Sequence, residues 1–307
     1  MTVVRWASSP WPIHNELERF TSEKGALGRN SSCMELREFA EKIVCSEGLA
    51  EKLTPPSCAP TDEDPGNARR MDGPGRVSTL RICPARDNRV PSIEGMQDPK
   101  QRAKIVHAFA NHELQAVELF AWALLAFPDA PSEFRRGLLT ILLDEQRHTR
   151  MYLARLADWG MSLGEYPLTG YFWNKVPGFH SPLRFICAMS LTFENANLDH
   201  TVNYSEAARS IGDPKTATII EQVHKDEIRH VRFGWRWLHE FKEDDLDAWE
   251  AYCDNVTWPL RAALARSDPF HREGRREAGI DHDFIERLHA STSEDGKRRE
   301  QEQAGEV

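Results

Sequence analysis

One heptapeptide pattern, D-E-x-R-H-x-R, occurs twice in the chain, at residues 144–150 and 226–232. In each copy the glutamate and the histidine are three residues apart, so a helix would place a carboxylate and an imidazole on one face. A further glutamate lies 32 residues before the glutamate of the first copy and 33 residues before that of the second. Two Glu-x-x-His motifs and two more inward glutamates are the ligand set of a dinuclear iron or manganese site in a four-helix bundle. The predicted metal ligands are Glu113, Glu145, His148, Glu194, Glu227 and His230.

A single Glu-x-x-His carries little weight, because the chain contains four of them. The other two, Glu221 with His224 and Glu286 with His289, lack the D…R…R frame and the matching upstream glutamate. One heptapeptide alone could equally be a solvated helix face with local ion pairs. The duplication of both frame and spacing favours the metal site.

The predicted ligands lie within apolar stripes of their helices, as Glu113 does between Phe109 and Phe120. Isolated carboxylates in such stripes would be costly or protonated, so four that converge require cations. The first helix is apolar nearly all round, which leaves Glu118 as a competitor for Glu113. Four histidines near the ligand turns are either hydrogen-bonded core residues or ligands, namely His107, His112, His200 and His224.

The aspartates of the two heptapeptides have two interpretations. Asp144 and Asp226 could accept the outer N–H of a ligating imidazole and so orient the ring. Each could instead pair locally with Arg147 or Arg229. The sequence leaves both interpretations open.

Three Asp-Pro or Ser-Pro pairs predict helix starts, with a capping oxygen before a proline at the first helical position, namely Asp98-Pro99, Ser181-Pro182 and Asp213-Pro214. The predicted long helices cover about 99–127, 132–159, 182–211 and 214–241. Short turns join the first to the second and the third to the fourth, so each pair is an antiparallel hairpin. The 21 residues 160–180 between the hairpins are long enough to cross the bundle. The predicted fold is all-α, a ferritin-like four-helix bundle with one long crossover.

The rest of the chain divides into flanking segments. Residues 1–97 are expected to form an N-terminal segment, loosely ordered over 1–30, with a short helix over 32–53 and an irregular wrapping region. Residues 98–266 form the predicted di-metal domain, including an extra C-terminal helix over 244–266 that is interrupted near Pro259. Residues 267–307 are charged and poor in large apolar side chains, which predicts a disordered tail.

The net charge of −9 makes nucleic acid an unlikely partner on electrostatic grounds. We see no secretion signal and no apolar run long enough to span a membrane, so we expect a cytoplasmic protein. The six cysteines form no Cys-x-x-Cys and are interpreted as free thiols in a reducing compartment.

Four stretches resemble an uncharacterised bacterial ferritin-like family, known mainly as a domain of unknown function and distantly similar to the di-iron tRNA hydroxylase family. They are HAFANHELQAVELFAWALLAFPDAP, LLDEQRHTRMYLARL, PLRFICAMSLTFENANLDH and VHKDEIRHVRFGWRWL. The resemblance covers roughly residues 36–240, and it implies the same six metal positions. It implies no substrate.

The leading functional hypothesis is an enzyme, a non-haem di-iron oxidase or monooxygenase that activates O2 on a small organic substrate. The cofactor would be two Fe ions, with Mn as the other metal that the ligands suit. No nucleotide, flavin or paired-cysteine motif is present, so an external electron donor or reductase is expected, and a homodimer is a further candidate assembly. The alternative is a housekeeping di-metal protein for iron oxidation and storage or for peroxide removal at a manganese pair. A third hypothesis is a helical scaffold with a vestigial site.

Overall fold

The computed structural model describes residues 33–84, 88–256 and 259–292, and these residues form an all-α protein. The strands among them are two pairs of residues, β1 (Ile82–Cys83) and β2 (Leu168–Thr169), which pair in parallel. The predicted all-α class is confirmed. In the described part of the chain no helix is both long enough and apolar enough to cross a membrane.

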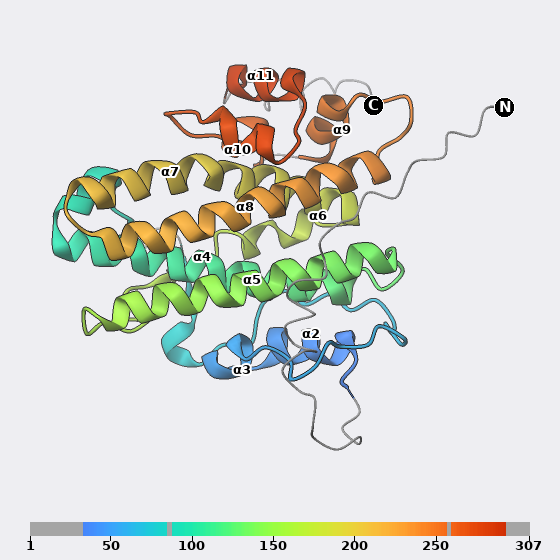
Figure 1. The fold of residues 1–307 in the computed structure, drawn as a ribbon. Helices are drawn as coiled ribbons and strands as arrows, with labels where there is room; N and C mark the ends of the chain where they lie inside the picture. Colours follow the sequence, from blue (N-terminus) through green and yellow to red (C-terminus); the bar gives the residue numbers. More distant parts are fainter. Residues whose placement is uncertain (1–32, 85–87, 257–258, 293–307) are drawn as a thin grey trace, which may run out of the picture.

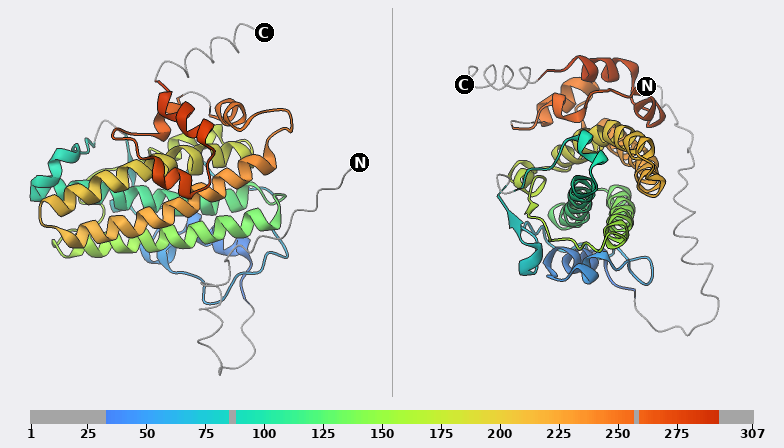
Figure 2. Two further views of the ribbon diagram at one scale, coloured as in Figure 1. Left: turned by 45° about the horizontal axis from the view of Figure 1, so that its top comes forward. Right: turned by 90° about the vertical axis from the view of Figure 1, so that its left-hand side faces the viewer.

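Four long helical segments lie side by side at the centre of the molecule (Figures 1 and 2). They are α4 (Pro99–Ala126), α5 (Ser132–Ala157), the composite α6 (Pro182–Ala188), η5 (Met189–Glu194) and α7 (Asn195–Ser210), and α8 (Pro214–Phe241). Helix α4 packs against α5, α7 packs against α8, and α8 closes the set by packing against α5. We call these four segments the helical core.

The predicted helix starts are confirmed in atomic detail. The side chain of Asp98 accepts a hydrogen bond from the backbone N–H of Gln101, that of Ser181 from Arg184, and that of Asp213 from Thr216. Each cap is followed by proline at the first helical position, where a missing N–H costs nothing. These caps fix where three of the four segments begin, and so fix the register of the ligands on them.

The third segment is not the uninterrupted α-helix that the sequence predicts, because its middle part, η5, is π-helical. Within it the hydroxyl of Thr192 donates to the carbonyl of Cys187, five residues earlier, at 2.7 Å. Helix α8 allows η5 to approach closely at Gly234, where a Cβ would come within 2.4 Å of Cβ of Ser190. A single π-helical turn inside an α-helix is common at functional sites. Here it ends at Glu194.

The predicted crossover, residues 160–180, connects α5 to α6 and is tied to α4. It contains β2 and the 3-10 helix η4 (Trp173–Gly178). Three side chains of α4 hold the crossover through hydrogen bonds. Asn111 donates to the carbonyl of Thr169. Gln115 accepts from the N–H of Phe172, and Glu118 accepts from the indole N–H of Trp173.

The N-terminal segment covers the α4–α5 side of the helical core (Figure 1). Helices α2 (Leu36–Cys45) and α3 (Leu49–Leu53) replace the single predicted helix over 32–53. Between α3 and α4 the described residues form short elements, namely η1 (Ser78–Leu80), β1 and η3 (Ile93–Gln97). This agrees with the predicted irregular region. The predicted loose order of residues 1–30 lies outside the described residues.

The interpretation of all six cysteines as free thiols is wrong, because Cys33 and Cys58 form a disulfide with their Cα atoms 6.1 Å apart. The pairing follows from a contact that joins distant parts of the N-terminal segment. The N–H of Leu36 donates to the carbonyl of Thr61 at 2.7 Å, which brings the two cysteines together.

The C-terminal part of the chain covers the α7–α8 side of the helical core (Figure 2). The extra helix is present as α9 (Ala248–Asn255), followed by the 3-10 helix η6 (Ala262–Ala265). The prediction of a disordered tail is wrong for residues 267–292, which form α10 (Arg272–Glu277) and α11 (His282–Ala290). The apolar residues of α11 are few but lie on one face, so Phe284, Ile285 and Leu288 are all buried. Residues 293–307 lie outside the described residues.

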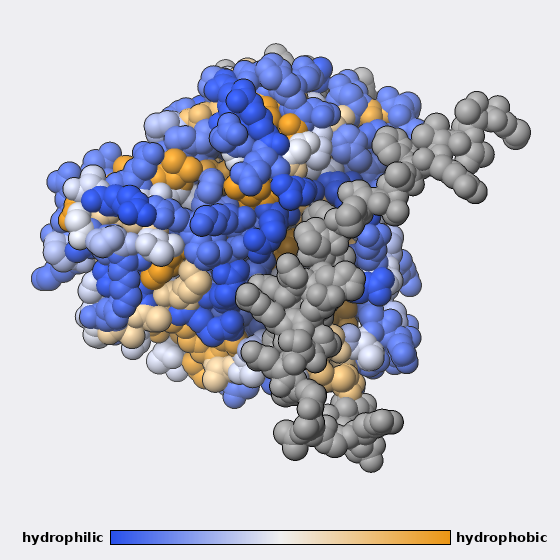
Figure 3. All heavy atoms as spheres, in the orientation of Figure 1, coloured by the Kyte–Doolittle hydropathy of each residue, from blue (hydrophilic) through white to orange (hydrophobic). Residues whose placement is uncertain are grey.

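The surface in Figure 3 is mostly hydrophilic with scattered apolar patches. The apolar side chains gather inside instead, in a continuous core that includes nearly the whole circumference of α4. Burial of each large aliphatic or aromatic side chain contributes about 1.5–3 kcal/mol. The core therefore provides the stability that a cluster of buried charged side chains requires.

Candidate metal centre

The six predicted ligands converge in the middle of the helical core, each 6% exposed or less. Their donor atoms form two overlapping groups, within each of which all atoms lie within 4.8 Å of one another. One group contains Glu113, Glu145, His148 and Glu227, and the other contains Glu145, Glu194, Glu227 and His230. Glu145 and Glu227 belong to both groups. Either group could hold a metal ion.

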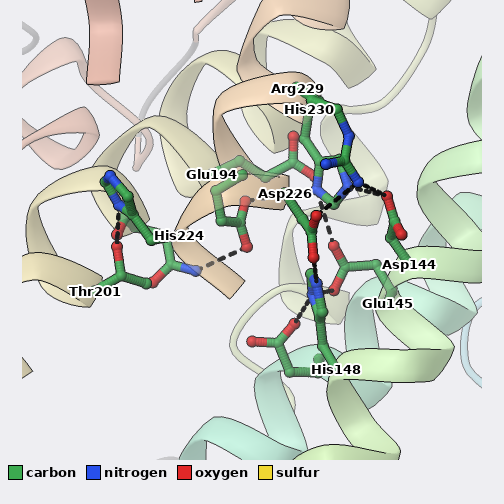
Figure 4. A network of polar contacts seen from close by, with 12 residues as sticks. Asp144, Glu145, His148, Glu194, Thr201, His224, Asp226, Arg229 and His230 are labelled. Carbon is green, nitrogen blue, oxygen red and sulfur yellow. Dashed lines mark hydrogen bonds and ion pairs between the residues drawn. The ribbon is translucent and has the colours of Figure 1, made fainter. Parts of the chain in front are cut away.

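Both imidazoles turn Nδ1 toward the carboxylates. Nδ1 of His148 lies 3.4 Å from Glu113 and 3.6 Å from Glu145. Nδ1 of His230 lies 3.1 Å from Glu145, 3.7 Å from Glu194 and 3.6 Å from Glu227. Figure 4 shows the carboxylate of Glu145 between the two rings.

The centre contains buried polar atoms that have no hydrogen-bond partner among the described residues. They are Nδ1 of both histidines, both carboxylate oxygens of Glu194, and Oε2 of Glu145 and of Glu227. Leaving such atoms unpaired costs about 1–3 kcal/mol each, and more for charged groups. Cations in the two donor groups would satisfy these atoms. Imidazole nitrogens and carboxylate oxygens together suit iron, manganese and zinc, so the residues present fit a metal.

Burial shifts the pKa values of the carboxyl groups in the cluster. Burial, together with the charges of the neighbouring carboxylates of Glu227 and Glu145, raises the pKa of Glu194 to about 8 against the opposing effect of His230. Burial likewise raises the pKa of Glu113 and of Glu227. In the metal-free protein these carboxyl groups therefore tend to keep their protons, which a bound cation would displace.

Each ring is oriented by the aspartate of the other heptapeptide. Nε2 of His148 on α5 lies 3.0 Å from Oδ2 of Asp226 on α8, and Nε2 of His230 lies 3.3 Å from Oδ2 of Asp144. An acceptor at Nε2 places the proton there and leaves the Nδ1 lone pair free for a metal. The predicted orienting role of both aspartates is supported, with the partners exchanged between helices.

The alternative arginine pairing occurs as well. Arg147 lies 2.6 Å from both Asp144 and Asp226, while Arg229 lies 3.0 Å from Asp144 and 2.6 Å from Asp226. Burial disfavours charge on the two aspartates, but their contacts with the histidines outweigh it and lower both pKa values, with a further hydrogen bond from Arg147 at Asp144 and from Gln222 at Asp226. The pKa values of the acceptors of both imidazoles are thus held low.

The last arginine of each heptapeptide has a structural role that the sequence did not suggest. Arg150 donates to the carbonyl of Leu53 at 2.6 Å, and Arg232 donates to the carbonyl of Glu277 at 2.5 Å. The first fastens the N-terminal segment to α5 and the second fastens the C-terminal part to α8. Each heptapeptide therefore provides two candidate ligands, an aspartate that contacts the imidazole of the other heptapeptide, and an attachment for a flanking segment.

The competing candidates are excluded from the cluster by their partners. Glu118 is buried beside two cations, with Lys52 at 3.2 Å and Arg76 at 2.8 Å. Glu221 and Glu286 pair with Arg209 and Arg272 away from the centre.

None of the four additional histidines belongs to the two donor groups within the described residues. Nε2 of His107 accepts the N–H of Gly164, and Nδ1 of His224 lies 2.8 Å from the hydroxyl of Thr201. His112 and His200 line the cavity described next, and burial lowers the pKa of both, that of His112 to about 4.

A cavity of about 400 Å³ opens onto the cluster, and all four glutamates line it. Its walls are largely apolar and aromatic, and Tyr171 and Phe172 of the crossover contribute to them. The volume lies within the range of about 300–1,000 Å³ that is typical of small-molecule sites. The sequence alone did not reveal this cavity.

Comparison with known proteins adds a family but no activity. An uncharacterised protein of Haemophilus influenzae is 25% identical over 161 residues, which are 50% of this chain and 56% of that protein. The chain thus spans little more than half the length of this relative. No solved structure gives a significant match. A family model described as "Protein of unknown function (DUF455)" matches residues 35–286, and the chain belongs to this family.

Proposed function

We propose that this protein is a non-haem di-iron oxidase or monooxygenase that uses O2 to oxidise a small organic molecule. In this proposal the helical core is a ferritin-like bundle, with residues 160–180 as its single long crossover. The cofactor is a pair of iron ions held by Glu113, Glu145, His148, Glu194, Glu227 and His230.

The observation that carries the proposal is the overlap of the two donor groups at Glu145 and Glu227. Glu145 and Glu227 would be available to both ions, and one further glutamate and one histidine would be available to each ion. Two divalent ions would also balance the four carboxylates, so the buried cluster would be neutral.

The iron pair would supply the reduction of O2 and the oxidising step. The protein orients the ligands through Asp144 and Asp226 and encloses the centre in the helical core, from which water is largely excluded. The cavity would place an organic molecule beside the four glutamates. Electrons would come from an external reductant, as the sequence suggests.

The housekeeping alternative, iron storage or peroxide removal at a manganese pair, needs the same ligands but no site for an organic molecule. The apolar and aromatic cavity beside the ligands therefore favours an oxidase or monooxygenase.

An oxygen electrode tests the proposal. Protein reconstituted anaerobically with Fe(II) should consume O2 on exposure and continue to do so when an external reductant is supplied. The Glu145→Gln variant should not, whereas Glu221→Gln, which alters the exposed Glu221–Arg209 pair on the same core, should behave like the unmodified protein. Reconstituted protein that is inert toward both O2 and peroxide would rule the proposal out.

A further inference from the structure

We infer that the cavity beside the metal-ligand cluster selects small organic acids with an apolar, ring-sized body, and that Arg266 binds their carboxylate. This inference rests on the proposed function, because it assigns the substrate class of the same site. It concerns the C-terminal part of the chain, which brings Arg266 to the cavity wall.

The charged side chains that line the cavity favour an anionic ligand when metal is bound. Among the described residues that line it, Arg266 is the only permanent cation, and the only carboxylates are the four glutamates of the cluster. Once metal ions neutralise those glutamates, the guanidinium of Arg266 is the only permanent charge left among the described lining residues. A ligand with a carboxylate at that point would compensate it.

The remaining walls suit a flat apolar body. The rings of Phe172 and Phe193 are stacked with their centroids 4.6 Å apart, and both line the cavity. Phe109 lies on the wall as well, with its ring 5.0 Å from that of Tyr204 and 5.7 Å from that of Tyr152. Such surfaces bind aromatic or other planar groups through area burial and ring contacts.

Arg266 is held in place by a buried ion pair and is not a loosely placed surface residue. Asp199 on α7 accepts hydrogen bonds from the backbone N–H groups of Ser267 at 2.9 Å and His271 at 2.7 Å, so it fixes the chain directly after Arg266. Arg275 binds both oxygens of Asp199, at 2.7 and 2.9 Å, and both side chains are fully buried. Asp199 and Arg275 are thus positioning residues for Arg266.

The guanidinium of Arg266 is available to a ligand. Its side chain is 18% exposed and pairs with Asp268, whose side chain is 82% exposed. Its Nε is buried and has no hydrogen-bond partner among the described residues. Ion pairs with such an exposed carboxylate are weak. A carboxylate that enters from the less solvated cavity can therefore compete with Asp268 and satisfy Nε.

A matched pair of probes tests the inference without any turnover. The dissociation constants of 4-phenylbutanoate and of its neutral analogue 4-phenylbutanamide would be measured by calorimetry on protein loaded with redox-inert Zn²⁺. The carboxylate should bind about ten- to a hundredfold more tightly than the amide. Arg266→Gln should remove this preference and Arg266→Lys should retain part of it. Asp268→Asn should strengthen carboxylate binding, because it removes the competing carboxylate.

Arg272→Gln is the control, because Arg272 belongs to the same part of the chain but pairs with Glu286 and does not line the cavity. It should leave both dissociation constants unchanged. Equal binding of amide and carboxylate by the unmodified protein, no binding of either, or a preference that survives Arg266→Gln would each overturn the inference. Two bound metal ions with O2 consumption but no carboxylate preference would leave the proposed function intact. A carboxylate preference in a protein inert toward O2 would overturn the proposed function alone.

Discussion

Asp226 on α8 lies 3.0 Å from the outer nitrogen of His148 on α5, so the aspartate of one heptapeptide orients the histidine of the other. The reciprocal contact joins Asp144 to His230. The two repeats therefore form one unit across the α5–α8 interface, and neither copy can position its histidine alone.

This exchange predicts the effect of isosteric variants. Asp226→Asn should weaken metal affinity by about 10- to 100-fold, because an amide no longer stabilises the tautomer that frees Nδ1. Asp144→Asn should act similarly through His230. Metal titration followed by calorimetry measures both, with the exposed Glu221→Gln as control. Unchanged affinity in both variants would reduce the aspartates to partners of Arg147 and Arg229.

Glu145 and Glu118 are both buried glutamates of the helical core, and they should respond in opposite ways. Glu145→Gln should abolish metal binding, because it removes a carboxylate that belongs to both donor groups. Glu118→Gln leaves Lys52 and Arg76 buried without their counter-charge and should cost about 3–5 kcal/mol of unfolding free energy. Its metal content, measured by elemental analysis, should remain normal. Loss of metal in Glu118→Gln with normal metal content in Glu145→Gln would mean that Glu118, and not Glu145, is a ligand.

The C-terminal helices should contribute to stability, because Arg275 is fully buried against Asp199. Arg275→Ala leaves that aspartate buried and unpaired, so we expect a loss of about 3–5 kcal/mol in urea unfolding and faster proteolysis of residues 259–292. Arg276→Ala is the matched control, since its side chain is 54% exposed. If the two variants are equally stable, the C-terminal part does not dock on α7.

The ligand cluster of the metal-free protein should contribute less stability as the pH rises. The pKa of Glu194 is about 8 in the folded chain against an ordinary value of 4.5, so the folded state binds this proton more tightly than the unfolded state does. The resulting stability is full below about pH 4.5 and disappears as the pH approaches 8. The pKa values of His148 and His230 are also raised, by the surrounding carboxylates against the effect of burial, and this acts in the same direction.

Urea unfolding at pH 5 and pH 8, with chelator and with Mn(II), measures this effect. Added metal should reverse the trend, because binding requires deprotonated ligands. Comparison with Glu194→Gln isolates this effect from the buried His107 and His112, whose lowered pKa values act in the opposite direction. An equal change in stability between pH 5 and pH 8 in both metal-free proteins would contradict the prediction.

Local patterns made the helices and the ligands predictable from the sequence. The caps at Asp98, Ser181 and Asp213 depend on contacts within three residues, and the duplicated heptapeptide fixes which residues share a helix face. Both features can be recognised without knowledge of tertiary packing, so the helix starts and the convergence of the six candidate ligands could be predicted from the sequence.

The missed features depend on contacts between distant segments. The π-helical turn before Glu194 accompanies the close approach of η5 to Gly234. The order of residues 267–292 depends on the buried Arg275 and on a few buried apolar side chains, among them Ile280 and Phe284, which composition alone does not distinguish from a disordered tail. The exchange of aspartates between heptapeptides and the pairing of Cys33 with Cys58 likewise require the folded arrangement.

Metal stoichiometry combined with X-ray absorption tests the central claim, a dinuclear centre, most directly. Protein loaded anaerobically with Fe(II) and freed of excess metal should contain two ions per chain, about 3.5–4 Å apart, as expected for a shared two-metal site. Glu145→Gln should lose this metal–metal signal and Glu221→Gln should keep it. A single ion per chain, or no stoichiometric metal after careful reconstitution, would contradict the account.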